Sequence, residues 1–407
     1  MTSPATSRHS AGFWAVAYAF LVVMAFSAIP TPLYVLYQQR DGFSSLTITL
    51  IFAVYALGVV ASLFLVGHLS DRDGRRSWMV RAVLLTIVSA IVFLTWESLA
   101  GLMVGRLLNG LGVGAMTATA TAWIAELHAT ARPGESPQRA QTVATASNLG
   151  GIGLGPLVGG VLAQWVAGPL TTPYAVMLVA LVIALIAVLS VPETREPADP
   201  KPAYRPQRVA VPDSARPVFA ASATGAFVAF ALMGLFNSLA PAFIGGTLGH
   251  HSRALAGFAA FIVFAAAAGA QVATGRRGPG EITDLGIKLM LVGPALLIAA
   301  VWLPSLPVFL TGGAVGGAGA GLLFKGALGA VAAVAPPAQR AEALAGVFLA
   351  GYVGLTVPVI GLGLLTQELA ADVSLTVFAA LMMLGVVVTA AQRAALAGSA
   401  AERAAAA

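Results

Sequence analysis

The chain has 407 residues, of which 58% are hydrophobic and only 9% are charged. Soluble domains carry about 25% charged residues, so a chain of this composition cannot cover a water-facing surface and is expected to lie in lipid. A formal net charge of +6 can indicate that a protein binds nucleic acid. The absence of cysteine excludes a disulfide framework and a thiolate metal site.

Apolar runs long enough to cross a membrane recur along the whole chain. A hydrocarbon layer of ~30 Å requires roughly 20 helical residues, and these runs lack the alternation of apolar and polar residues that a membrane β-barrel shows. No small-residue cleavage site follows the first run, so we expect a helix there and not a signal peptide. The sequence predicts an all-α membrane protein with twelve transmembrane helices, at 13–38, 45–67, 77–96, 99–126, 138–165, 172–191, 215–245, 254–275, 284–303, 306–333, 340–366 and 373–395.

A polar break rich in proline and charge divides the predicted helices six and six. We expect an N-terminal six-helix bundle at 1–191, a cytoplasmic linker at 192–214, and a C-terminal six-helix bundle with a tail at 215–407. Four glycines of the fourth helix recur in the tenth at one constant offset: Gly105, Gly110, Gly112 and Gly114 correspond to Gly312, Gly317, Gly319 and Gly321. This repeat indicates a duplicated six-helix unit, a common construction among secondary transporters.

Basic residues gather on one side of the predicted membrane. With a cytoplasmic N-terminus, only Arg40 and Arg253 lie on the opposite side, and Arg106 and Lys325 fall inside helices. Short loops rich in lysine and arginine face the cytoplasm, so we expect a multi-pass protein of the cell membrane, in bacteria the inner membrane, with both termini cytoplasmic. Topology then explains the basic charge, and no nucleic-acid partner is expected.

Three stretches resemble motifs of the major facilitator superfamily. GHLSDRDGRR at 67–76 agrees at every defined position with the family signature G-x-L-[AS]-D-[RK]-x-G-R-[RK]. RLLNG at 106–110 is similar to R-x-x-Q-G, with asparagine in place of glutamine, and GIGLGPLVGG at 151–160 resembles the antiporter motif G-x-x-x-G-P-x-x-G-G. The longest form of that motif has a further upstream glycine, where this chain has Thr142. The resemblance spans the chain and implies the major facilitator fold in a drug/proton antiporter-like transporter.

The first motif is the expected conformational latch. Glycine lets the loop turn tightly and two helices approach, while an acid can interact with helix ends and arginines can pair with acids. The resemblance implies that such a cluster holds the outward-open state. The alternative to a latch is that the basic residues only set the membrane topology, as positive charge on the cytoplasmic side, and that the glycines only form a tight turn. The corresponding turn at 273–280 lacks the aspartate, so we expect the latch in one half only. The expected latch residues are Gly67, Asp71, Arg72, Gly74, Arg75, Arg76 and Glu126.

Polar groups inside the predicted helices are the candidates for coupling and substrate binding. Placing an arginine at the centre of a membrane helix costs ~3 kcal/mol on insertion scales. Arg106 and Lys325 each have two interpretations: the side chain lines a cavity, or it extends to the membrane surface by snorkelling. The coupling or cavity candidates are Arg106, Asn109 and Lys325. In the family, helices 1, 4, 7 and 10 line the cavity. The substrate candidates are Tyr34, Tyr37, Gln38, Asn148, Phe236 and Asn237, with an interfacial aromatic belt as the alternative for the tyrosines.

The antiporter-like motif has two interpretations. Small residues permit close helix packing, and a proline can bend the helix between moving halves. Its residues are Gly151, Gly155, Pro156, Gly159 and Gly160.

No catalytic or metal-binding pattern accompanies these motifs. The five histidines fall in loops or at helix ends, and there is no nucleophile elbow, catalytic carboxylate pair or phosphate loop. We therefore expect a protein that is not an enzyme and uses no cofactor. Its expected partners are a small-molecule substrate, protons and the lipid bilayer, and its expected state is a monomer.

The function implied by the resemblance is proton-coupled export of a small apolar or amphiphilic compound by alternating access. No aspartate or glutamate lies deep in a predicted span, so coupling would run through Glu126 and the arginines, or be absent. One alternative is an importer or facilitator of a small metabolite on the same fold. The other is a membrane receptor or assembly factor that does not transport.

Overall fold

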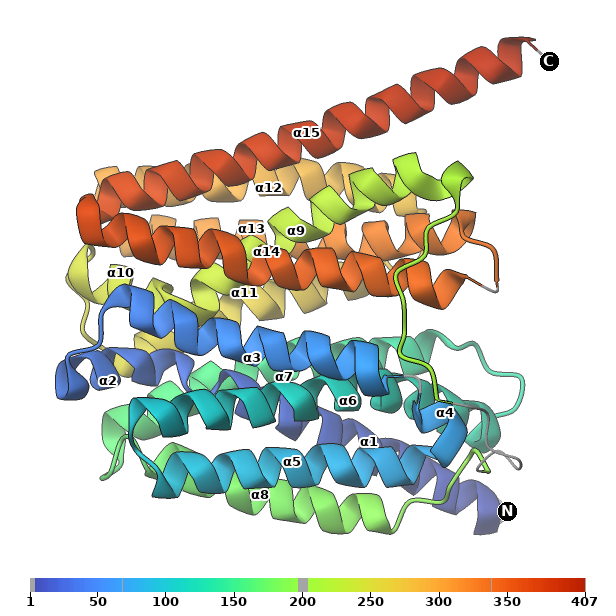
Figure 1. The fold of residues 1–407 in the computed structure, drawn as a ribbon, viewed down its shortest axis with the longest axis horizontal. Helices are drawn as coiled ribbons and strands as arrows, with labels where there is room; N and C mark the ends of the chain where they lie inside the picture. Colours follow the sequence, from blue (N-terminus) through green and yellow to red (C-terminus); the bar gives the residue numbers. More distant parts are fainter. Residues whose placement is uncertain (1–3, 68, 197–203, 338, 407) are drawn as a thin grey trace. The chain divides into compact units, whose positions relative to one another are not determined.

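The structure is a computed structural model that describes residues 4–67, 69–196, 204–337 and 339–406. Within these ranges every regular element is a helix (Figure 1). Twelve of them, some continued by a short helix, are long and apolar enough to cross a membrane. The predicted all-α protein with twelve transmembrane helices is confirmed.

The first part of the chain contains nine helical elements in the described residues. They are α1 (Pro4–Ala28), the 3-10 turn η1 (Thr31–Leu33), α2 (Tyr34–Asp41), α3 (Ser45–Val66), α4 (Leu69–Asp73), α5 (Arg75–Thr95), α6 (Leu99–Ala131), α7 (Gln138–Trp165) and α8 (Thr172–Leu189). After the linker follow η2 (Asp213–Ala215), α9 (Arg216–Ser238), α10 (Ala240–Gly246), α11 (Arg253–Ala273), α12 (Pro279–Trp302), α13 (Leu306–Val334), α14 (Arg340–Glu368) and α15 (Ala371–Ala406).

Two predicted spans contain a break. The span predicted at 13–38 is α1 followed by η1 and α2, and the span predicted at 215–245 is α9 followed by α10. Pro30 and Pro32 follow α1, and Pro241 lies in the first turn of α10. Proline lacks the N–H that a continuing helix requires, so the helix stops and restarts at these positions.

Other helices end elsewhere than predicted. The fourth span continues past 126 to Ala131, and the last continues past 395 to Ala406. The second ends at Val66 and is followed by the short α4, which was not predicted and which lies inside the motif at 67–76.

The chain forms two compact units. Unit 1 contains Met1–Phe43, Leu50–Gln207 and Ser252–Phe261, and unit 2 contains Ser44–Thr49, Arg208–His251 and Ile262–Ala407. The domain bounds expected from the sequence, 1–191, 192–214 and 215–407, stay a prediction. Residues 197–203 of the expected linker lie outside the described residues.

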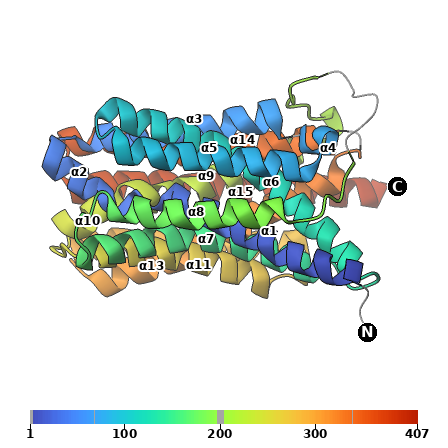
Figure 2. The ribbon, with the colours of Figure 1, turned by 90° about the horizontal axis from the view of Figure 1, so that it is seen from below.

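Close helix packing in unit 1 depends on glycine. Helix α1 packs against α6, α7 and α8, and α5 packs against α6 and α8 (Figures 1 and 2). Helix α6 meets α3 at Gly110 and Gly58, where a Cβ added to either glycine would lie about 3 Å from the other's Cα. Backbones approach this closely only where both residues are small. The contact places α6, which carries Arg106 and Asn109, against α3, which carries Tyr55.

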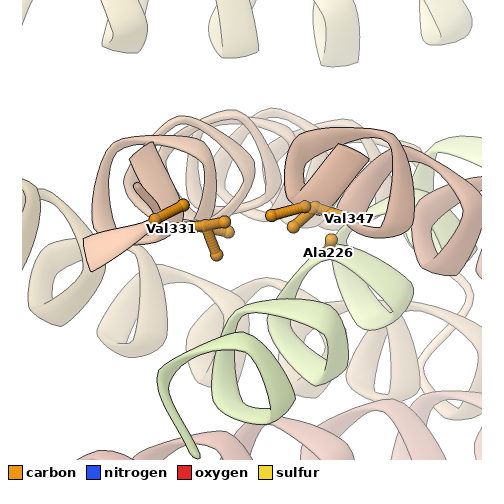
Figure 3. Packing of buried hydrophobic residues seen from close by; sticks show 6 residues of the cluster. Ala226, Val331 and Val347 are labelled. Atoms are coloured by element: carbon orange, nitrogen blue, oxygen red, sulfur yellow. The ribbon is translucent and has the colours of Figure 1, made fainter. Parts of the chain in front are cut away.

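In unit 2, helices α9, α13, α12 and α15 pack in a ring, each against the next, and α14 packs against α9. Buried small side chains of α9, α13 and α14 form a core between them. Figure 3 shows Ala226 of α9 next to Val347 of α14, with Val331 of α13 farther along the same cluster. Phe219 and Phe324 are partly buried against this core. Small residues allow these helices to approach one another closely, as glycine does in unit 1.

Candidate functional site

The arginine that begins α5 is the centre of an ion-pair cluster. The Arg75 side chain is only 5% exposed, and its Nη2 donates to Asp71 Oδ1 at 2.6 Å and to Glu126 Oε1 at 2.7 Å. Its Nε also donates to Glu126, at 3.2 Å, and its Nη1 donates to Ser70 Oγ at 2.8 Å. These four residues, called the Arg75 cluster below, join α4, the start of α5 and the last turns of α6.

Two glycines permit the turn that carries the cluster. Gly74 separates α4 from α5 with φ at 94°, a conformation that side chains with a Cβ rarely adopt. A Cβ there would also lie 2.9 Å from Oε2 of Glu193. A Cβ on Gly67 would lie 2.7 Å from the carbonyl oxygen of Leu63. His68, which is also part of the motif, lies outside the described residues.

Sequence reasoning missed the residues that follow α8. The Glu193 carboxylate accepts hydrogen bonds from the backbone N–H of Arg75 at 3.0 Å and of Arg76 at 2.9 Å. It thereby caps the start of α5, where the helix leaves its N–H groups unpaired and its dipole favours an anion. The only signal in the sequence was that the linker opens with an acid and a base, PETR.

The next two residues contact the cluster itself. Thr194 donates its hydroxyl to Glu126 Oε2 at 2.6 Å, and Arg195 Nε donates to the backbone carbonyl of Asp71 at 3.0 Å. The guanidinium of Arg195 lies 3.8 Å from the carboxylate of Asp71. The beginning of the linker is therefore bound to the same groups that the motif at 67–76 brings together.

The other charged residues of the motif lie beside the cluster. Arg72 pairs with its neighbour Asp73 at 3.1 Å. The side chain of Arg76 is exposed, and its backbone N–H is the group that contacts Glu193.

A second polar group is buried in unit 1. The Arg106 side chain of α6 is 1% exposed; its Nη1 donates to the Ser27 carbonyl at 2.6 Å and its Nε to Tyr34 Oη at 3.1 Å, with a second bond from Nη2 to the same phenol. The guanidinium carbon also lies 5.5 Å and 5.4 Å from the ring centroids of Tyr34 and Tyr55. Arg106 is thus buried among α1, α2 and α3 and does not snorkel to a surface of the unit.

Asn109 lies one helical turn beyond Arg106. It is fully buried, and neither Nδ2 nor Oδ1 has a hydrogen-bond partner among the described residues. An unpaired buried polar group costs about 1–3 kcal/mol. Nearby, the hydroxyls of Tyr37 and Tyr174 lie 3.2 Å apart, and Gln38 is half-buried.

Lys325 occupies a different setting. In α13 of unit 2, its Nζ donates to the backbone carbonyl of Gln271, near the end of α11. Gln271 in turn donates its side-chain amide to the Gly321 carbonyl at 3.0 Å. A cation at a helix C-terminus is stabilised by the helix dipole, so the contact accounts for Lys325 as a link between α11 and α13.

The antiporter-like motif packs α7 against its neighbours in unit 1. Cβ atoms on Gly151, Gly155 and Gly159 would each meet a backbone carbonyl oxygen of α1 or of the turn that follows it, and one on Gly160 would meet the Arg253 carbonyl. Pro156 lies inside α7. This arrangement accounts for the glycines by close packing.

The remaining substrate candidates are not brought together by one unit. Asn148 is half-buried on α7 of unit 1. Phe236 and Asn237 are buried on α9 of unit 2, where the ring of Phe236 lies 5.5 Å from that of Phe309. Their proposed role in substrate binding stays a prediction.

Comparison with protein families shows which family the chain belongs to. Residues 15–283 match the family model of the Major Facilitator Superfamily. The chain belongs to this family. It is a multi-pass membrane protein, and its family is one of transporters and not of enzymes. Among the described residues, no group of three or more His, Asp or Glu side chains could hold a metal ion.

Two similar proteins can be named. An uncharacterized MFS-type transporter of Methanocaldococcus jannaschii is 28% identical over 151 residues, which are 37% of this chain and 37% of that relative. The matched region is thus little more than a third of the relative's length. The crystal structure of the human organic anion transporter MFSD10 (TETRAN) matches with a TM-score of 0.65 at 19% identity, covering 95% of this chain and 100% of that one. This likeness shows the fold.

Proposed function

We propose that the protein is a secondary active transporter that exports a small amphiphilic compound in exchange for protons, by alternating access. The observation that carries the proposal is the buried guanidinium of Arg106. Both of its hydrogen-bond partners, a carbonyl and a phenol, are uncharged. A cation in the membrane interior costs several kcal/mol and marks a substrate or ion pathway by default.

The surroundings of Arg106 favour one class of substrate. Two aromatic rings, Tyr34 and Tyr55, lie against the guanidinium, and Asn109 offers unpaired donor and acceptor atoms one turn along the same helix. A compound with an apolar body and a polar or anionic group would satisfy these groups together. The description of the human structural relative as an organic anion transporter supports an anionic group.

The Arg75 cluster supports a conformational latch and a route for proton coupling. Glu126 accepts hydrogen bonds from two nitrogens of Arg75, and its side chain is 30% exposed, so a proton can reach it from water. Protonation would remove the negative charge that holds Arg75 and would weaken the cluster. A proton would thereby bias the two-state equilibrium of the transporter without a carboxylate deep in the membrane.

Direction, location and assembly are part of the same proposal. The resemblance of GIGLGPLVGG at 151–160 to the antiporter motif supports export. The distribution of lysine and arginine supports a cell-membrane location with both termini cytoplasmic. We take the monomer as the working unit, with substrate, protons and lipid as its partners and no nucleic acid.

The test is transport by the purified protein in liposomes with an acidic interior. Amphiphilic anions, amphiphilic cations, sugars and amino acids are offered outside. We expect uptake of an amphiphilic compound that stops when a protonophore collapses the gradient. Arg106→Ala should abolish this uptake. The matched control is Arg81→Ala, because Arg81 stacks on Trp78, with its guanidinium carbon 4.6 Å from the ring centroid, and lies outside both sites.

Three outcomes would overturn the proposal. Equilibration of a metabolite without dependence on the proton gradient would identify a facilitator or importer. Ligand binding without counterflow exchange would identify a receptor or assembly factor. Equal uptake by Arg106→Ala and Arg81→Ala would remove Arg106 from the transport pathway.

A further inference from the structure

A pocket of about 130 Å³ lies inside unit 2, within the ring formed by α9, α13, α12 and α15. For comparison, an engineered apolar protein cavity of about 150 Å³ binds benzene. All residues that line the pocket belong to these four helices, near the end at which α9 and α12 begin and α13 finishes. The pocket is therefore formed by unit 2 alone, and no residue of the Arg106 site in unit 1 lines it.

Small residues leave this space between the helices. Ala221 and Gly225 of α9 line the pocket together with Gly326, Ala327 and Ala330 of α13. A Cβ added to Gly225 would meet a single atom within 4 Å, the Thr389 methyl at 3.4 Å. Elsewhere in the unit, a Cβ on Gly293, Gly317 or Gly354 would meet the backbone of a neighbouring helix at under 3 Å. Gly225 is thus not required for close approach of two backbones, and its lack of a side chain contributes to the volume of the pocket.

One charged side chain lines the pocket. Arg393 of α15 is 26% exposed; its Nη2 donates to the Gly280 carbonyl at 3.2 Å, and its Nη1 pairs with the carboxylate of Asp284. Asp284 is 62% exposed, so this ion pair contributes at most about 1 kcal/mol. The backbone carbonyl holds the guanidinium in place, whereas the exposed carboxylate can be exchanged for another.

We propose that this pocket binds a small amphiphilic anion, with an apolar body of about the size of a benzene ring among the helices and a carboxylate on Arg393 in place of Asp284. A guanidinium binds carboxylates through two parallel hydrogen bonds, which favours this group over a neutral one. The displaced Asp284 is exposed, as is Lys288 one turn further along α12, and residues four apart are neighbours on a helix surface. Two acyl chains of a phospholipid exceed the volume of the pocket.

The test is equilibrium dialysis of the purified full chain in detergent against radiolabelled benzoate, with benzyl alcohol as the neutral competitor. We expect benzoate to bind and benzyl alcohol to compete at least tenfold less well. Arg393→Gln should weaken benzoate binding at least tenfold. Asp284→Asn should strengthen it about two- to fivefold, because it removes the competing carboxylate.

Blocking the volume gives an independent arm. Gly225→Leu should fill the pocket and abolish binding, and the smaller Gly225→Ala should weaken it while leaving the packing intact. The matched control is Gly269→Leu in α11, since no atom lies within 4 Å of a Cβ built there. Size-exclusion chromatography identifies any variant that has not folded, and Gly225→Ala and Asp284→Asn then carry the test.

Several results would overturn the proposal. If benzoate does not bind, there is no anion site in this pocket. The same conclusion follows if the parent, Arg393→Gln and Gly225→Ala bind benzoate equally well. Equal competition by benzyl alcohol would make it an apolar cavity only. Saturable binding of phosphatidylglycerol in lipid nanodiscs that Arg393→Gln abolishes, with no benzoate binding, would assign the arginine to a lipid headgroup instead. None of these measurements depends on transport, so the inference and the proposed function can fail separately.

Discussion

Glu126→Gln should disrupt the Arg75 cluster more than Asp71→Asn, although the aspartate belongs to the motif and the glutamate does not. Arg75 makes three hydrogen bonds to Glu126, from Nε to both carboxylate oxygens and from Nη2 to Oε1, and only one to Asp71. The Asp71 side chain is 53% exposed and that of Glu126 is 30% exposed. Water therefore screens the aspartate more strongly than the glutamate.

The magnitudes follow from these contacts. An exposed ion pair contributes about 0.2–1 kcal/mol, whereas hydrogen bonds to a charged group in a partly buried site contribute about 1.5–3 kcal/mol. With about 0.5 kcal/mol for Asp71 and about 2 kcal/mol for Glu126, loss of the charge shifts the ratio of latched to unlatched states about twofold and about 30-fold respectively. Gln and Asn keep the side-chain shape, so folding and insertion should survive.

The assay is maleimide labelling of a single introduced cysteine, since the chain has no native cysteine. Thr119→Cys is the reporter, because Thr119 is 1% exposed and lies two turns before Glu126 on α6. Labelling should be fastest with Glu126→Gln, intermediate with Asp71→Asn and slowest in the parent. Glu97→Gln is the control. The Glu97 carboxylate pairs with Arg40 and not with Arg75, and Glu97 precedes Leu99, the first residue of α6.

Two results would refute the reasoning. Equal labelling rates in all backgrounds, with transport also unchanged, would mean that GHLSDRDGRR at 67–76 serves only topology and a tight turn. A larger effect of Asp71→Asn than of Glu126→Gln would mean that exposure and hydrogen-bond number are the wrong guide to the strength of this cluster.

Four other predictions test the remaining assignments. Arg106→Lys should keep partial transport only if transport needs the positive charge at this position and not the bidentate geometry of a guanidinium. Full transport by Arg106→Ala would contradict any role of Arg106 in transport. Tags at both termini and in the linker at 192–214 should be protected in sealed cells, and a linker accessible from outside would refute the six-plus-six topology. Glu193→Gln should cost about 1 kcal/mol, seen as roughly fivefold faster hydrogen exchange at the start of α5, whereas Glu135→Gln should not. Asn109→Leu should raise the free energy of unfolding by about 1 kcal/mol and lower transport; unchanged transport would assign Asn109 no function.

The sequence was sufficient for the number of spans because lipid restricts how a chain can cross it. A helix must be about 20 apolar residues long, so run lengths alone predicted the twelve spans that the structure contains. The break after α1 was not predicted, although Pro30 and Pro32 were visible. Both prolines lie within a continuous apolar stretch, and hydropathy predicts one helix for such a stretch. It does not take into account that proline lacks the backbone N–H that a continuing helix needs.

Side-chain partners were predictable only where position along a helix determined them. Glu126 was expected to be near the arginines of 67–76 because both were placed at one end of neighbouring helices. Glu193 was not expected, because it follows Arg75 by 118 residues and lies in a segment with the composition of a linker. Its role depends on where the end of α8 meets the start of α5, and no local pattern encodes that contact.

The motif RLLNG at 106–110 combines two physical requirements that the sequence alone does not separate. Gly110 is a packing residue, since α6 and α3 approach one another at Gly110 and Gly58. Arg106 and Asn109 contribute nothing comparable to packing: one is a buried cation with uncharged partners, and the other is a buried amide with unpaired atoms. A fold selected for stability alone would replace both with apolar residues. The glycine therefore explains how the helices come together, and the two polar residues are where the function of the protein has to be sought.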